Sequence, residues 1–264
     1  HKAIRRQRQM CIRDSIYTII IGKCFSNTVL GYYSRADQFA QFPSSNLTGI
    51  MQRVTFPVLS AIQNEDERLR TNYRKFLRLS AFVIFPLMIG LSALAAPFVE
   101  LLLTDKWAGA IPLLQVICVA YMWYPIHAIN LNLLQVKGRS DLFLKLDVIK
   151  KISSTIILFI TVPIGVLAMC YGSIAISVMA LVINTYYTGK LIKIGFLTQM
   201  RDILPIIASC ILMFFLITIA ISFFEHCLVK LIVGIVIGVM SYLSVAYFFR
   251  YTELDELLSI IKRK

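Results

Sequence analysis

The stretch GYYSRADQFAQFPSSNLTGIMQRVTFPVLSAI, from Gly31 to Ile62, decides the fold. It is long enough to cross a membrane, since a spanning helix needs about 20 mostly apolar residues. Polar groups inside such a helix usually face a water-filled cavity or another helix. We therefore expect this helix to border a polar cavity within a membrane protein. The side chains that lipid would reject are Arg35, Asp37, Gln38, Gln41, Gln52 and Arg53.

The composition of the whole chain agrees with a membrane protein. Of its 264 residues, 58% are hydrophobic and only 16% are charged, and the mean hydropathy is +0.74. Soluble domains are about 45–50% apolar and about 25% charged. The sequence predicts an all-α protein, a polytopic bundle of transmembrane helices. Long runs without formal charge are Ile111–Val136, Ile152–Gly189, Ile203–Phe224 and Leu231–Phe249.

The run Ile152–Gly189 is too long for one crossing. At about 1.5 Å per residue it would extend for about 57 Å, nearly twice the thickness of the hydrocarbon layer. The segment PIGVLAMCYGS, with Pro163, Gly165 and Gly172, supplies a turn. We predict one partial span at 15–31 followed by about seven full ones. The full spans are expected at 38–62, 79–103, 111–136, 152–170, 172–190, 203–224 and 230–250.

Lysine and arginine are distributed unequally between the segments that link these spans. Segments 63–78, 137–151 and 190–202 and the C-terminal tail together contain 17 of them, whereas the opposite side has 4, at Lys23, Arg35, Lys106 and Lys230. Cytoplasmic segments of membrane proteins carry such an excess. We therefore predict that the C-terminus is cytoplasmic. The net charge of +13 is explained in the same way: the expected anionic partners are lipid headgroups or an acidic lipid-linked substrate, not nucleic acid.

One helical face of the quoted stretch is polar. Its side chains recur at intervals of three and four residues, as neighbours on one helix face do. We interpret this face as a wall of the substrate route. Arg35 and Arg53 are candidates for binding an anion, although Arg53 could snorkel to the cytoplasmic surface and Arg35 with Asp37 could form an interfacial anchor. The polar face consists of Ser34, Gln38, Gln41, Ser45, Thr48 and Gln52.

A second polar group lies in the predicted span 111–136. His127 and Asn130 are three residues apart, so they share a face, and Pro125 interrupts the backbone hydrogen bonds beside them. Two interpretations stay open: hydrogen bonding between helices, or contact with substrate or a proton. The last two spans have few polar residues, and Gly234 and Gly238 form a GxxxG packing face there.

Other kinds of site are not predicted. The six cysteines contain no CxxC pair, so we interpret them as small core residues. The three histidines have no neighbouring ligands, so no metal site is expected, and no cofactor either. Residues 1–14 lack the apolar region of a signal peptide and resemble no part of the pattern that follows. We interpret them as a non-native or disordered tail.

Several stretches carry a family resemblance. They are IYTIIIGKCFS, LGYYSRADQFAQFPSSNLTGIMQRVTFPVLSAIQ, FPLMIGLSALAAPFVELLLTDKW and AINLNLLQVKGRSDLFLKLDVIKK. Over residues 15–264 the chain resembles the C-terminal half of bacterial Wzx-type polysaccharide and lipopolysaccharide biosynthesis flippases. These belong to the multidrug/oligosaccharidyl-lipid/polysaccharide exporter superfamily. The resemblance implies the second lobe of a two-lobed transporter, with the N-terminal lobe of the same protein missing from this sequence. It also implies that cationic residues in the cavity hold the diphosphate of the substrate.

The resemblance implies a function. The whole protein would flip undecaprenyl-diphosphate-linked oligosaccharide repeat units across the bacterial inner membrane, in contact with membrane lipids, for surface or exported polysaccharide. No bond is made or broken, so it would not be an enzyme. Residues 15–190 would line the cavity, and 191–264 would form two peripheral helices and a cytoplasmic tail. The alternatives are a cation-coupled multidrug exporter of the same superfamily and a membrane-embedded polysaccharide polymerase or ligase.

Overall fold

A computed structural model describes residues 17 and 19–256, which form helices joined by short turns. The predicted all-α helix bundle is confirmed, with no strand among the described residues. Residues 1–14, predicted to be a tail, lie outside the described part. The elements are α2 (Asn27–Ala61), α3 (Asp66–Ala93), α4 (Ala95–Leu103), the 3-10 helix η1 (Asp105–Ala110), α5 (Ile111–Tyr121), α6 (Tyr124–Val136), α7 (Ser140–Thr161), α8 (Val166–Ile192), α9 (Phe196–Ile221) and α10 (Cys227–Phe248).

Five segments of the described chain are long and apolar enough to cross a membrane. The helices α2 and α7 are long enough but are not among them. Charged and amide side chains are spread along α2, and five charged residues lie within Asp141–Lys151 of α7. The predicted number of seven full spans is therefore confirmed only in part. The five segments are Asp66–Ala93, Asp105–Val136, Val166–Ile192, Phe196–Ile221 and Cys227–Phe248.

Several helix boundaries differ from the prediction. Helix α2 begins at Asn27, after Ser26, whose hydroxyl accepts a hydrogen bond from the Val29 N–H at 3.4 Å. A separate helical stretch ends at Cys24. The prediction of one partial span over 15–31 is therefore wrong, because a capping serine starts a new helix inside it. The predicted span 79–103 is likewise divided at Leu94, between α3 and α4.

The turn predicted inside the long uncharged run is confirmed. Helix α7 ends at Thr161 and α8 begins at Val166, after Gly165 with φ of 134°. That φ favours glycine. Gly172, also predicted to belong to the turn, lies inside α8 instead. A Cβ atom there would lie 2.9 Å from Cγ2 of Ile157, so this glycine lets α8 pack closely on α7.

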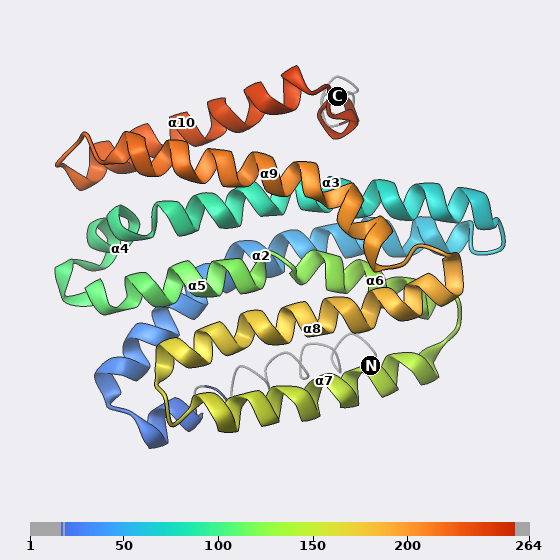
Figure 1. Cartoon of the computed structure of the whole chain (residues 1–264), viewed down its shortest axis with the longest axis horizontal. Coiled ribbons are helices and arrows are strands. Elements are labelled where there is room, and N and C mark those ends of the chain that lie inside the picture. The colour runs from blue at the N-terminus through green and yellow to red at the C-terminus, as the bar shows by residue number, and fades with distance from the viewer. Residues whose placement is uncertain (1–16, 18, 257–264) are drawn as a thin grey trace.

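Apart from the short link between α5 and α6, which lies midway along the bundle, the connections gather at its two ends (Figure 1). One end holds α4, η1 and the turns α7–α8 and α9–α10, and the opposite end holds the turns α2–α3, α6–α7 and α8–α9. The predicted basic segments lie at this second end, which we call the basic end. Much of them is helix, since α3 already begins at Asp66 and α7 at Ser140. That this end is cytoplasmic stays a prediction.

Helix α3 is the centre of the packing, in contact with α2, α5, α6 and α9. Helix α10 packs on α9 and α4. A Cβ atom on Gly234 would collide with Leu94, and one on Gly238 would lie 2.9 Å from Cδ1 of Ile217. The predicted GxxxG packing face is confirmed, because both glycines are the contact points of α10. The interpretation of the cysteines as core residues is confirmed for Cys118, Cys170 and Cys210, which are buried. It is wrong for Cys24, which is exposed, and Cys227 is only half-buried.

Candidate functional site

Helix α2 presents one face to the bundle and leaves the other open. Small side chains on the packed face let α5 and α6 approach it closely, and the Ser44 hydroxyl donates to the Tyr121 carbonyl at 2.8 Å. Pro43 and Pro57 lie inside the helix, where proline removes backbone hydrogen bonds and bends the axis. Figure 1 shows α2 running behind α5 and α6 from one end of the bundle to the other. The buried residues of α2 are Tyr33, Ala36, Ala40, Ser44, Thr48, Thr55 and Leu59.

The predicted polar stripe lies along the border between these two faces. Ser34 and Gln38 are exposed, and Gln41, Ser45 and Gln52 are half-buried. Thr48 alone is buried, with 3% of its surface exposed. The stripe is therefore exposed at Ser34 and Gln38 and at most partly exposed along the rest of its length. Whether substrate touches it stays a prediction.

Arg35 is held in place at the end of α2 opposite the basic end. Its guanidinium donates to Oε1 of Gln38 at 3.0 Å and lies 5.9 Å from the centre of the Trp107 ring. Trp107 belongs to η1, which is fixed to α2 because the Tyr32 hydroxyl donates to the Lys106 carbonyl at 3.0 Å. That Arg35 and Asp37 form an interfacial anchor pair stays a prediction.

Arg53 is exposed nearer the basic end of α2. Five other arginines each form an ion pair with a carboxylate, whereas neither Arg35 nor Arg53 does so in the part of the chain that the structure describes. Two exposed guanidinium groups without carboxylate partners are therefore present on α2. The paired arginines are Arg68, Arg70, Arg74, Arg78 and Arg139.

Asn130 lies away from α2's open face, inside a buried polar network. Its Oδ1 accepts from the Thr188 hydroxyl at 2.7 Å and from Nε2 of Gln199 at 3.2 Å. Its Nδ2 donates to Oε1 of Gln199 at 3.1 Å. All three side chains are fully buried. The geometry favours the interpretation of hydrogen bonding between helices, here α6, α8 and α9, over direct contact with substrate.

His127 extends the same network. Its Nδ1 lies 3.4 Å from Nδ2 of Asn184, another fully buried residue of α8. The ring is half-buried and sits one helical turn from Asn130. The structure therefore brings His127 and Asn130 together, but it does not bring either of them to the stripe on α2.

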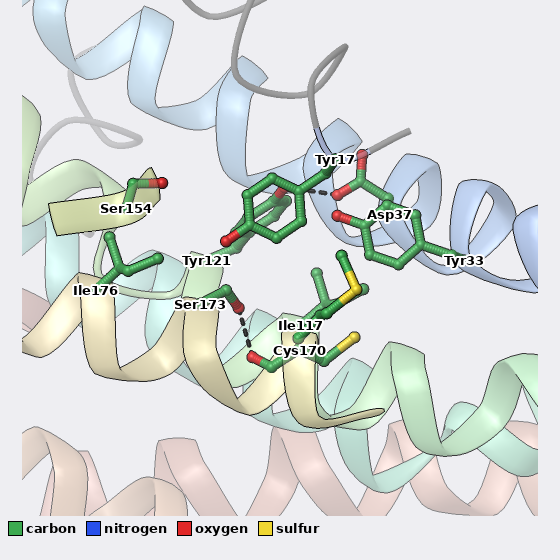
Figure 2. A pocket seen from close by; sticks show the side chains of 10 residues that line it. Tyr17, Tyr33, Asp37, Ile117, Tyr121, Ser154, Cys170, Ser173 and Ile176 are labelled. Atoms are coloured by element: carbon green, nitrogen blue, oxygen red, sulfur yellow. Dashed lines mark hydrogen bonds between the residues drawn. The ribbon is translucent and has the colours of Figure 1, made fainter. Parts of the chain in front are cut away.

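Asp37 lies in a small cavity between α2, α5, α7 and α8 (Figure 2). Its Oδ1 accepts a hydrogen bond from the Tyr121 hydroxyl at 2.5 Å. The cavity has room for about one water molecule. Hydroxyl groups predominate around the carboxylate, an arrangement suited to holding a proton or a small cation. The lining residues with polar or sulfur atoms are Tyr17, Tyr33, Asp37, Tyr121, Ser154, Met169, Cys170 and Ser173.

Part of this chain matches a known protein family. Residues 8–112 match the family described as "Polysaccharide biosynthesis protein". The predicted family resemblance is confirmed. An uncharacterized membrane protein in the cps region of Klebsiella pneumoniae is 34% identical over 57% of this chain and 30% of its own length. Lipopolysaccharide biosynthesis protein WzxC of Escherichia coli (strain K12) is 32% identical over 53% of this chain and 28% of its own length.

Another relative of the same kind matches more of the chain. Teichuronic acid biosynthesis protein TuaB of Bacillus subtilis (strain 168) is 27% identical over 72% of this chain and 40% of its own length. The matched region thus spans less than half of each of these polysaccharide biosynthesis relatives.

The fold resembles a solved transporter. Lipid II flippase MurJ, in an inward closed conformation, superimposes with a TM-score of 0.72 at 19% identity. The likeness covers 90% of this chain and 52% of MurJ. At this identity it shows a shared fold. The resemblance to polysaccharide biosynthesis proteins and the shared fold therefore agree on a multi-pass membrane protein.

Sequence reasoning missed three features of the site. Asn46 is exposed on α2 and was not assigned to the stripe. Tyr121 lies in a predicted span but was not linked to Asp37, which precedes the predicted span 38–62. Gln199 was assigned to a basic segment, yet it is fully buried against Asn130. Only Asn46 had a local signal, since it is an amide side chain next to Ser45 of the stripe. The other pairs are 84 and 69 residues apart.

Proposed function

We propose that the whole protein flips undecaprenyl-diphosphate-linked oligosaccharide repeat units across the bacterial inner membrane for surface or exported polysaccharide. Its C-terminus would be cytoplasmic. The observation that carries the proposal is the open face of α2 and its polar border. Half-buried amide and hydroxyl groups lie there beside two arginines that have no carboxylate partner among the described residues. A sugar chain needs hydrogen-bonding groups, and a diphosphate needs guanidinium groups that make charge-assisted hydrogen bonds.

The relatives support this proposal. Their names assign them to lipopolysaccharide and teichuronic acid biosynthesis, and one further relative is called succinoglycan biosynthesis transport protein ExoT, from Rhizobium meliloti (strain 1021). These products are polysaccharides made from units that must cross a membrane. In the proposed mechanism the stripe on α2 faces a missing N-terminal lobe of the same protein. Rocking of the two lobes exposes the route to each side of the membrane in turn.

Cells that depend on the full-length protein for surface polysaccharide test the proposal. Arg53→Ala should cause lipid-linked repeat units to accumulate in the cytoplasmic leaflet, together with loss of surface polysaccharide. Arg68→Ala is a matched control, because Arg68 is also exposed but already pairs with Glu65 at 2.8 Å. Normal surface polysaccharide in the Arg53→Ala cells would contradict the role of Arg53.

A cation-coupled multidrug exporter is the second candidate. The observation in its favour is the Asp37 cavity, where a carboxylate accepts from Tyr121 among several hydroxyl groups. Coupling to protons or sodium requires such an acidic group away from bulk water. Dye efflux by the full-length protein that Asp37→Asn abolishes would favour this function, with surface polysaccharide unaffected.

A membrane-embedded polysaccharide polymerase or ligase is the candidate from another class. It requires groups that make or break a glycosidic bond, and turnover of a lipid-linked substrate into longer chains would identify it. We propose that the protein is not an enzyme. Detection of such products with purified protein would overturn that part of the proposal.

A further inference from the structure

Arg35 and Arg53 occupy the same face of α2. They are 18 residues apart, and at about 3.6 residues per turn this separation is about five complete turns. Pro43 lies between them and can alter the register of the helix. Both arginines are nevertheless exposed. The two guanidinium groups therefore extend from the same open side of one helix.

The spacing of the two arginines matches the thickness of a membrane. Along a helix, 18 residues correspond to about 27 Å, and the hydrocarbon layer of a bilayer is about 30 Å thick. Arg35 is tied to η1 at one end of the bundle through Trp107. Arg53 lies toward the basic end. If α2 crosses the bilayer, one guanidinium lies near each headgroup layer.

The exposed residues of α2 that lie on this face between Arg35 and Arg53, here called the open line, carry no charge. Its exposed members are Gln38, Phe42, Asn46 and Ile50. Asn46 donates to the Phe42 carbonyl at 2.8 Å, so part of its hydrogen-bonding capacity is used within the helix. An anionic group thus has two favourable positions on this line, and they are separated by a neutral stretch of about four turns.

The two arginines differ in how firmly they are held. Arg35 lies over Trp107 and donates one hydrogen bond to Gln38, which leaves other guanidinium N–H groups open to a ligand. Arg53 has no such contact among the described residues, so its side chain is free to reach toward the basic end. A preorganised fork favours bidentate binding of phosphate oxygens.

We propose that α2 holds two separate sites for one phosphate-bearing lipid headgroup, one in each leaflet. Arg53 forms the loading site at the basic end, and Arg35, supported by Gln38 and Trp107, forms the release site at the other end. The ligand is a lipid whose headgroup is a phosphate or diphosphate. This inference rests on the proposed function, which it divides into two steps at two named positions.

Thiol protection in the full-length protein, with its native cysteines replaced, tests the two sites separately. Single Ser34→Cys and Val54→Cys variants place a thiol beside each arginine at an exposed position. The probe is farnesyl diphosphate, a short water-soluble lipid diphosphate, added before a charged thiol reagent. We expect it to slow labelling at both positions by threefold or more. Farnesol tests the lipid chain alone, and inorganic diphosphate tests the headgroup alone.

The arginine variants decide between two sites and one. Arg35→Ala should abolish protection at position 34 and leave it at position 54, and Arg53→Ala should do the reverse. Lys106→Ala is the matched control, because Lys106 is another exposed cation near Trp107. Loss of protection at both positions from either arginine variant would indicate one shared site and overturn the proposal. Equal protection by farnesol, or an equal effect of Lys106→Ala, would overturn it too.

The protection assay separates this inference from the function it rests on. Site-selective protection together with normal surface polysaccharide in cells that lack the protein altogether would overturn the flippase proposal and leave the two sites standing. Loss of surface polysaccharide without any protection by farnesyl diphosphate would overturn the two sites and leave the flippase proposal standing. Protection by inorganic diphosphate alone, without farnesyl diphosphate, would overturn the lipid as ligand.

Discussion

Arg74 and Asp202 form a two-pronged ion pair that joins α3 to the start of α9. The guanidinium Nε donates to Oδ2 at 2.7 Å, and Nη2 donates to Oδ1 at 2.6 Å. The two partners are unequally exposed, with 47% of the Arg74 side chain and 7% of the Asp202 side chain accessible. This inequality leads to a prediction, because the cost of losing a partner depends on which charge is left behind.

Arg74→Ala should destabilise the protein more than Asp202→Asn. The first change leaves a buried carboxylate without its partner, at a cost of about 3 kcal/mol. The second leaves a half-exposed guanidinium, which water can solvate, at a cost of about 1 kcal/mol. Thermal unfolding midpoints of the purified variants check the order. Equal or reversed midpoints would show that this pair does not hold α9 against α3.

Gly234→Leu should weaken the packing of α10 against α4 and α9. A side chain there meets Leu94 and also Ile221 Cγ2, 3.2 Å from the added Cβ, so α10 must move away from α4 and α9. Overpacking of this kind costs about 1–3 kcal/mol. The matched control is Gly49→Leu, since a Cβ on Gly49 has nothing within 4 Å. A lower unfolding midpoint for Gly234→Leu than for Gly49→Leu is expected, and similar midpoints would be evidence against close packing at Gly234.

The polar border of α2 should be accessible to water. In a full-length protein without native cysteines, Ser45→Cys and Gln52→Cys should react quickly with a charged thiol reagent. Thr48→Cys should react slowly because position 48 is buried, and Val236→Cys should react slowly because that exposed residue of α10 is expected to face lipid. Labelling rates check this order. If positions 45 and 52 react as slowly as 236, the stripe faces acyl chains and not a substrate route.

We expect Asn130 to contribute to the stability of the fold and not to substrate binding. Asn130→Leu leaves buried groups of Thr188 and Gln199 without their partner, which costs about 1–3 kcal/mol. We expect a lower unfolding midpoint, with transport per folded molecule largely kept. The double variant Asn130→Leu/Gln199→Leu should be less destabilised than the sum of the two single variants, because they share one network. Normal stability with lost transport would instead support contact between Asn130 and substrate.

Much of the fold could be predicted from the sequence because apolar length is a local property. Uncharged runs gave the helix bundle, and the excess length of Ile152–Gly189 required the turn that the structure has after Thr161. The boundaries were less predictable. Ser26 starts α2 within a stretch that reads as one span, and Leu94 separates two helices, because these breaks depend on capping and on contacts with neighbouring helices.

The basic segments illustrate the same limit. Arg74 and Arg78 were assigned to a loop that sets topology. In the structure they belong to α3, and they pair with Asp202 and with Glu253, which follows α10. Their charge was readable from the sequence, but their partners are more than 100 residues away. In the sequence, a basic loop and a basic extension of a helix beyond the membrane have the same composition, so they cannot be told apart.

The sequence by itself determined that this chain is a bundle of membrane helices, that one helix carries polar groups on one side, and that two of its arginines lie near opposite ends. These follow from periodicity and composition, which act along the chain. Tertiary structure alone decided that Asn130 is buried with Thr188 and Gln199, that Asp37 meets Tyr121, and that Trp107 lies against Arg35. Each of these contacts joins distant segments, and only packing determines which faces of two helices meet.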